Sequence, residues 1–246
     1  MMKHRIFETA TMRQKWGVRM NQTQLIVMLT HNDYTVADAT AVFEACRHTP
    51  VQYWGAKEQG IAPDRLKRLF DAVNAAGKYG VLEVVSCDES ACLAGAETAI
   101  ACGCRMLLGT RYFDSVNALC RQHNIRYMPF VGTVSQRPSI LEGSAADMID
   151  EARRYAACGV HGIDLLGYRY VGDADALCRS VIEAGGTAVC LAGSINSVER
   201  LAQVRALQPS YFTIGSAFFE HRFGESIPEQ IAFVCRYMNG EEGCEC

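Results

Sequence analysis

Short apolar runs alternate with longer amphipathic stretches along most of the 246-residue chain. The short runs are typical of strands buried on both faces, and the stretches between them have the apolar spacing of covering helices. Eight strand-then-helix units indicate an α/β fold whose parallel sheet closes into a (β/α)8, or TIM, barrel. The predicted strands are residues 24–29, 51–54, 81–85, 106–108, 125–131, 162–166, 187–191 and 211–214, and predicted helices include 36–47, 64–76 and 145–158.

Local boundary signals support this plan. Thr35 and Asp38 resemble a capping box that opens the first helix, and Pro63 suits the first turn of the second. Gly77 and Gly159 stand where helices are expected to end. The elements therefore have local start and stop signals as well as the right periodicity.

The pattern indicates one domain. We expect the barrel to occupy residues 23–240, because no linker or low-complexity segment interrupts it, and we treat residues 1–22 as an N-terminal extension. Residues 1–20 carry six Lys, Arg or His side chains without an apolar core, so they do not resemble a secretory signal, and a cytoplasmic protein is expected.

Composition narrows the classes of function. The chain is 49% hydrophobic and 21% charged with a net charge of -3, an ordinary globular balance that gives no reason to expect nucleic acid. No apolar run has the length of a membrane span, so no membrane partner is expected. Self-association is compatible with the sequence, which defines no subunit number.

Metal and cofactor signals are weak. Most of the 12 cysteines fall inside predicted elements and suit reduced, packed thiols, and Cys102-Gly103-Cys104 lacks a second ligand pair at zinc spacing. No nucleophile elbow, phosphate-binding Walker loop or dinucleotide fingerprint is present. We expect no cofactor and no metal, although carboxylates alone leave a hard-cation site open.

Two glycine turns follow the last two predicted strands, Ala192-Gly193-Ser194 and Ile214-Gly215-Ser216. Each precedes a helix-compatible stretch, where backbone N–H groups gather and attract an anion. Glycine lets the backbone approach such an anion closely. We therefore predict that Gly193, Ser194, Gly215 and Ser216 bind a phosphate, as the loops after strands 7 and 8 of barrels do.

The connection after the fifth strand, residues 132–144, is long for this fold. It opens on the active-site face and contains Arg137 and Ser139, which suit an anionic substrate. The alternative is a tolerated surface insertion. We favour a role in substrate binding.

Three carboxylates lie in or beside predicted strands. Glu83 interrupts an apolar run and should face the barrel interior, either for acid–base work or in a structural ion pair. Asp164 stands near the mouth of the sixth strand, and Asp33 follows the first, where it could instead cap a helix. Together they could supply the base and the acid for a proton transfer.

Two basic residues complete the candidate site. Lys57 is the only one of five lysines near the C-terminal end of a predicted strand, and it could donate a proton, stabilise an enolate or form a Schiff base. A solvated charge paired with Glu58 is the alternative. Arg169 follows the sixth strand and could bind a carboxylate or a second phosphate, or form a salt bridge with Asp173.

The glycine turns resemble those of the ribulose-phosphate-binding barrels, a superfamily of phosphosugar isomerases and epimerases, synthases and aldolases. The match is best over residues 162–219, where Ala192-Gly193-Ser194-Ile195 and Thr213-Ile214-Gly215-Ser216-Ala217 look like the superfamily's phosphate loops. The resemblance implies a TIM barrel and a phosphate held by both turns. Schiff-base aldolases of this kind usually carry a lysine on the sixth strand, and this chain has none there.

These observations favour an isomerase or epimerase of a small phosphorylated sugar or sugar acid, with proton transfers shared among Asp33, Lys57, Glu83 and Asp164. A carbon–carbon lyase, aldolase or synthase that uses Lys57 is the first alternative. A phosphate-binding barrel without catalysis is the second.

Overall fold

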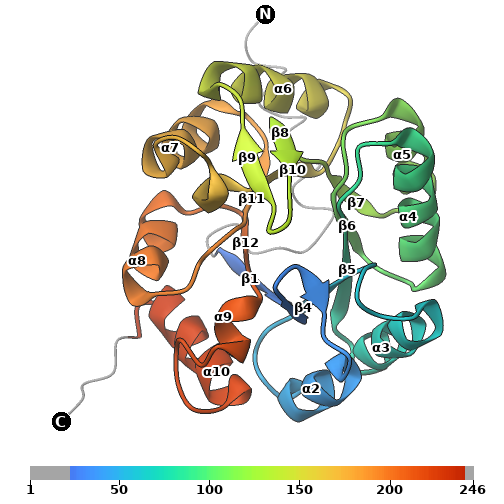
Figure 1. The fold of residues 1–246 in the computed structure, drawn as a ribbon, viewed down its shortest axis with the longest axis vertical. Helices are drawn as coiled ribbons and strands as arrows, with labels where there is room; N and C mark the ends of the chain where they lie inside the picture. Colours follow the sequence, from blue (N-terminus) through green and yellow to red (C-terminus); the bar gives the residue numbers. More distant parts are fainter. Residues whose placement is uncertain (1–22, 242–246) are drawn as a thin grey trace, which may run out of the picture.

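Eight parallel strands form the centre of the protein and helices surround them (Figure 1). The structure is a computed structural model that describes residues 23–241, so the predicted extension at 1–22 lies outside the described residues. The strand order is β10-β11-β12-β1-β4-β5-β6-β7. The strands are β1 (Gln24–Met28), β4 (Tyr53–Lys57), β5 (Tyr79–Val84), β6 (Met106–Gly109), β7 (Arg126–Met128), β10 (Gly162–Leu165), β11 (Ala188–Leu191) and β12 (Tyr211–Ile214).

The two outer strands of this order, β7 and β10, meet and complete the barrel. The backbone N–H of His161 donates to the carbonyl of Tyr127 at 3.0 Å, and that of Asp164 donates to the carbonyl of Pro129 at 2.8 Å. The predicted TIM barrel is thus confirmed, with all eight predicted strands in place to within a few residues.

The helices alternate with the strands and form the outer layer. Side-chain caps start several of them: the Ser144 hydroxyl accepts from the Asp147 N–H, and Ser226 with Glu229 forms a capping box. The helices are α2 (Ala39–Cys46), α3 (Pro63–Ala75), α4 (Glu89–Ala101), α5 (Asp114–Gln122), α6 (Ala145–Ala157), α7 (Ala174–Ala184), α8 (Val198–Leu207), α9 (Ser216–Phe219) and α10 (Ile227–Met238), with a 3-10 turn η1 (Gly167–Arg169). Within residues 23–241, no helix combines the length and apolar character that crossing a membrane requires.

Two small antiparallel hairpins extend from the C-terminal end of the barrel. The first pairs β2 (Thr30–His31) with β3 (Tyr34–Thr35), and the second pairs β8 (Thr133–Ser135) with β9 (Ile140–Glu142). The predicted capping box at Thr35 is wrong, because Thr35 belongs to β3 and α2 begins after Asp38 without a side-chain cap. The long connection at 132–144 is the second hairpin, whose arrows lie over the central strands in Figure 1.

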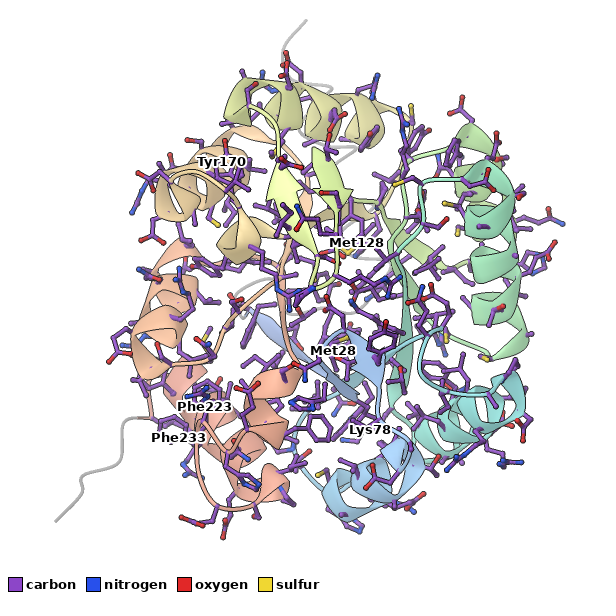
Figure 2. All side chains as sticks on the ribbon, viewed as in Figure 1. Met28, Lys78, Met128, Tyr170, Phe223 and Phe233 are labelled. Carbon is purple, nitrogen blue, oxygen red and sulfur yellow. The ribbon has the colours of Figure 1, made fainter. Side chains whose placement is uncertain are left out.

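Alternation along each strand divides the core into two parts. Ile26 and Met28 of β1 face the barrel interior, whereas Leu25 and Val27 face the helices. Figure 2 shows Met28 and Met128 inside the ring of helices. The interior cluster is Ile26, Met28, Tyr53, Val81, Met106, Leu108, Met128, Cys190 and Tyr211.

A polar group closes the N-terminal end of the barrel. Arg126 donates to the hydroxyls of Tyr53 and Tyr211 at 2.9 and 3.2 Å. His161 Nε2 lies 3.1 Å from the Tyr211 hydroxyl. Burial, together with the charge of Arg126, lowers the pKa of His161 to about 4. These side chains lie at or next to the first residues of β4, β7, β10 and β12.

Candidate active site

Strand alternation brings Lys57, Glu83 and Asp164 to the inner face of the barrel, near its C-terminal end. Tyr53 of β4 and Val81 of β5 face the interior. Side chains two or four residues further along a strand lie on the same face, so Lys57 on β4 and Glu83 on β5 face the interior too. Lys57 and Glu83 are register partners on neighbouring strands. Lys57 is the last residue of β4, because this strand runs three residues beyond the predicted strand 51–54, and not part of the following loop as expected.

The Lys57 ammonium joins two carboxylates from different parts of the chain. Its Nζ lies 3.1 Å from Asp33 Oδ1 and 3.2 Å from Glu83 Oε1, and its side chain is only 7% exposed. Burial disfavours the ammonium, but the charges of Glu83 and Asp33 outweigh burial and hold the pKa of Lys57 above its ordinary value. Lys57 is therefore a buried cation within an ion network and not a solvated loop charge.

Asp33 lies in the turn of the β2–β3 hairpin, where its φ is 67°. Its second carboxylate oxygen, Oδ2, accepts from Arg169 Nη1 and from the backbone N–H of Ser139, both at 2.9 Å. Burial opposes the charge, but Lys57, the Ser139 N–H and Arg169 together hold the pKa of Asp33 far below its usual range. Asp33 is permanently anionic and does not cap a helix.

Asp164 is the most buried carboxyl of the group, at 1% exposure. Its Oδ1 has no hydrogen-bond partner among residues 23–241. Burial and the nearby charge of Glu83 raise its pKa well above the ordinary value, against the opposing effects of Lys57 and the Gly109 N–H. Asp164 is therefore a buried carboxyl whose protonated form is favoured, with an oxygen inside the barrel that has no partner among the described residues.

The β8–β9 hairpin and η1 cover this network from above. Besides the Ser139 N–H contact with Asp33, Arg169 Nη1 approaches the Ser139 carbonyl at 3.4 Å. Arg169 therefore pairs with Asp33 and not with Asp173, which caps α7. Arg137 is not part of the network, because its guanidinium lies over the exposed Tyr34 ring at 5.8 Å.

The two glycine turns lie at the same end of the barrel. An added Cβ on Gly193 would stand 2.9 Å from Arg169 Cγ, and one on Gly215 would stand 2.6 Å from Thr30 Oγ1. These neighbours leave too little room for a Cβ, so packing is by itself a sufficient reason for glycine at both turns. Ser216 begins the short helix α9, as expected, but two residues separate Ser194 from the Ser197 cap of α8. The turn at Gly193 is therefore a loop and not a helix start.

A hydrogen bond links the second turn to the acid network. The Asn32 N–H donates to Ser216 Oγ at 3.0 Å, and Asn32 directly precedes Asp33. Because this oxygen serves Asn32 as an acceptor, the hydroxyl hydrogen of Ser216 stays available for an anion.

Sequence reasoning missed two residues of the site. The Thr35 hydroxyl donates to the Lys57 carbonyl at 2.7 Å and accepts from the Lys57 N–H at 2.8 Å, which holds the first hairpin on the end of β4. Glu58, considered only as a partner of Lys57, has a buried oxygen with no hydrogen-bond partner among the described residues. Burial, with some contribution from Glu83, raises its pKa. The turn-forming pair Asn32-Asp33 lies between the residues of β2 and β3, and this pattern could have indicated the hairpin.

Comparison with known proteins identifies structures of the same fold at low sequence identity. No protein-family model and no curated protein sequence matches the chain. Similar solved structures include N-acetylmannosamine-6-phosphate 2-epimerase from Clostridium perfringens (TM-score 0.59, 12% identity, 89% of this chain and 93% of that one). Phosphoribosyl anthranilate isomerase from Thermus thermophilus has TM-score 0.57 and 17% identity over 88% and 99% of the two chains. Mycobacterium tuberculosis tryptophan synthase has TM-score 0.64 and 14% identity over 96% of each.

These similarities are low in sequence and extend over nearly the whole barrel. TM-scores of 0.57–0.64 demonstrate a common fold, and sequence identities of 12–17% single out no one protein. The resemblance suggested by the glycine turns is thus supported at the level of the fold alone: the chain shares the barrel architecture of these enzymes.

Proposed function

We propose that the protein is an isomerase or epimerase that acts on a small phosphorylated sugar or sugar acid by proton transfer. The observation that carries the proposal is the Lys57 ammonium held between Asp33 and Glu83, near the buried Asp164, whose pKa burial and Glu83 raise well above its ordinary value. A fixed cation next to an acid and a base stabilises the oxyanion that forms when a carbon next to a carbonyl loses its proton.

The network divides the chemical roles between its members. Glu83, ion-paired with Lys57, removes the proton from carbon, and Lys57 stabilises the enediolate oxygen that results. In an isomerase, Asp164 returns a proton to the neighbouring carbon while the hydroxyl proton passes from one enediolate oxygen to the other. In an epimerase, Asp164 returns a proton to the opposite face of the same carbon. Each turnover leaves Glu83 protonated and Asp164 ionised, and exchange with solvent restores both.

Asp33 has a different role from the one that the sequence favoured. A general base works best with a pKa near the working pH, and three donors hold the pKa of Asp33 far below it. We assign Asp33 to holding Lys57 and Arg169 in position in the free protein, and we leave the proton transfers to Glu83 and Asp164.

The phosphate handle comprises Gly193, Ser194, Gly215 and Ser216. Loops after strands 7 and 8, with a short extra helix, commonly bind phosphate in this fold, and α9 is such a helix. Two proteins of similar fold are named for phosphorylated substrates, phosphoribosyl anthranilate and N-acetylmannosamine 6-phosphate. We propose that the substrate's phosphate is held there.

The lyase alternative has less support. A Schiff-base lysine must lose its proton to attack a carbonyl, and burial alone would favour that. Here Glu83 and Asp33 outweigh burial and raise the pKa of Lys57, so its ammonium is stabilised. That favours an electrostatic role for Lys57 over a nucleophilic one.

The test is exchange of carbon-bound hydrogen with solvent. The protein is incubated in D2O with a panel of phosphorylated aldoses, ketoses and sugar acids, and proton NMR follows loss of C–H signals and appearance of isomers. We expect exchange with at least one compound, reduced about 100-fold or more by Glu83→Gln and by Asp164→Asn. Glu97→Gln, at an exposed site on α4, is the matched control.

Two further measurements, borohydride trapping and ligand binding, separate the alternatives. A borohydride-trapped adduct on Lys57 would support the lyase and contradict the isomerase. Binding of phosphorylated ligands with no exchange and no effect of the Glu83 and Asp164 variants would indicate a barrel without catalysis.

A further inference from the structure

Three donors converge on one carboxylate at the centre of the site. Asp33 Oδ1 accepts from Lys57 Nζ, and Asp33 Oδ2 accepts from Arg169 Nη1 and the Ser139 N–H. Two of the donors carry a positive charge, and the third is a backbone group on a different hairpin. Such a combination of an arginine, a lysine and a backbone N–H is typical of a site that recognises a carboxylate ligand.

Asp33 reaches these donors from an accessible part of the chain. It lies in a two-residue turn next to the exposed Asn32, and both residues have positive φ values, 50° for Asn32 and 67° for Asp33. The backbone of this turn is held separately, through the Asn32 N–H bond to Ser216. Exchange of Asp33 for another carboxylate would require its side chain to rotate toward the mouth while this backbone bond stays in place.

We propose that Lys57, Arg169 and the Ser139 N–H form a subsite for a carboxylate of the substrate, and that Asp33 fills this subsite in the free protein. The inference rests on the proposed function and narrows its substrate class to phosphorylated sugar acids. The incoming carboxylate takes the place of the Asp33 carboxylate, and no bond is made or broken.

Charge balance favours a carboxylate as the ligand group. Lys57 and Arg169 supply two positive charges, and Asp33 and Glu83 supply two negative ones. A carboxylate that replaces Asp33 preserves this balance, whereas a hydroxyl would leave an excess of buried positive charge. A phosphate would bring a third oxygen for which these three donors offer no hydrogen bond.

Arg169 also sets the distance between this subsite and the phosphate turn. Its Cγ lies against Gly193, where an added Cβ would stand 2.9 Å away, while its Nη1 reaches Asp33. One side chain therefore extends from the phosphate turn to the carboxylate subsite. A substrate whose phosphate and carboxylate are separated by a few carbons spans the same interval.

Two ligands that differ only in the carboxylate test the inference. Calorimetric titration compares 3-phosphoglycerate with sn-glycerol 3-phosphate, which has a hydroxymethyl group in place of the carboxylate. Removing the competing anion with Asp33→Asn should tighten 3-phosphoglycerate binding about ten-fold and change glycerol 3-phosphate binding less than about three-fold. Circular dichroism checks that each variant is folded.

A second variant keeps the test decisive if Asp33→Asn folds poorly. Arg169→Gln should abolish the preference for 3-phosphoglycerate, while Arg68→Gln, the same change at an exposed arginine on α3, should leave it unchanged. Propane-1,3-diol bisphosphate tests a second phosphate in the same subsite.

Each result has a defined meaning. Equal binding of both ligands to the wild type and to Asp33→Asn overturns the carboxylate subsite but leaves the phosphate handle standing. Weaker 3-phosphoglycerate binding by Asp33→Asn, or tighter binding of the bisphosphate, also overturns it. If neither ligand binds to the wild type, the phosphate handle and the proposed function fail together. The same follows if both ligands bind and Ser216→Ala leaves their affinities unchanged.

Discussion

The two ends of the barrel both carry polar side chains, but they are organised differently. At the N-terminal end, Arg126 donates to the phenol oxygens of Tyr53 and Tyr211, and His161 stays neutral beside them. At the C-terminal end, charges of opposite sign interlock around Lys57. A layer of apolar side chains, three of them methionine, separates the two groups.

The difference teaches how to recognise the working end of the barrel. At the N-terminal end the phenols pair with Arg126, and burial with the charge of Arg126 lowers the pKa of His161 to about 4. At the C-terminal end, the pKa of Asp164 is raised and that of Asp33 is lowered, and one Asp164 oxygen has no partner among the described residues. Displaced pKa values of opposite sense in one cluster are typical of a site that moves protons.

The largest expected effect comes from removing the cation at the C-terminal end. Lys57→Met leaves Asp33 and Glu83 buried without their shared partner and should lower the free energy of unfolding by about 3–5 kcal/mol. Chemical denaturation measures it. Lys67→Met, which removes an exposed pair with Asp71, is the control and should cost less than about 0.5 kcal/mol. Equal losses would show that Lys57 is not a buried partner of the two carboxylates.

At the opposite end, His161 should make stability depend on acid pH. Its pKa is about 4 in the folded protein and near 6.5 when unfolded, so the unfolded chain binds a proton that the folded one refuses. The wild type should lose up to about 3 kcal/mol as the pH falls from about 6.5 to 4. Denaturation at several pH values measures this, and His161→Gln should flatten the profile.

The exposed His123 supplies the control for that measurement. His123→Gln should retain the wild-type slope between pH 6.5 and 4. An unchanged slope in His161→Gln would mean that the imidazole is not held neutral at the N-terminal end.

Asp164 should give the opposite sign of pH dependence. The folded protein keeps a proton on Asp164 that the unfolded chain releases above about pH 4, so this residue lowers stability as the pH rises toward its folded pKa. Asp164→Asn should therefore be more stable than the wild type at pH 8, by about 1–2 kcal/mol, while catalysis is lost. Asp150→Asn, at an exposed position, should change neither. A destabilised Asp164→Asn at pH 8 would contradict a protonated Asp164.

The smallest effect is expected from the N-terminal phenols. Tyr53→Phe removes one acceptor of Arg126 and should cost about 1 kcal/mol of stability. It should leave binding of sn-glycerol 3-phosphate unchanged, since the apolar layer separates it from the turns. Tyr34→Phe, at an exposed ring, should change stability by less than that. Weakened ligand binding by Tyr53→Phe would break the distinction between the two ends.

Periodicity predicted the barrel because each strand had to be apolar on both faces. The same reasoning located Glu83 and Asp164, since a charged residue inside such a run stands out against its neighbours. Which partners these residues meet depends on strand register, and Lys57 opposite Glu83 is a property of the folded sheet.

Hydrophobic periodicity did not predict the two hairpins. Thr35 looked like a helix cap, because Thr-x-x-Asp is common at helix starts, yet the turn at Asn32-Asp33 placed it in a strand against Lys57. The contact of Ser139 with Asp33 joins residues 106 positions apart through a backbone N–H, which no side-chain pattern encodes.

The bond from the Asn32 N–H to Ser216 joins the two halves of the proposed site. Ser216 belongs to the proposed phosphate handle, and Asn32 precedes the residue that occupies the proposed carboxylate subsite. Ser216→Ala would therefore take an acceptor from the turn that carries Asp33 at the same time as it takes a hydroxyl donor from the phosphate.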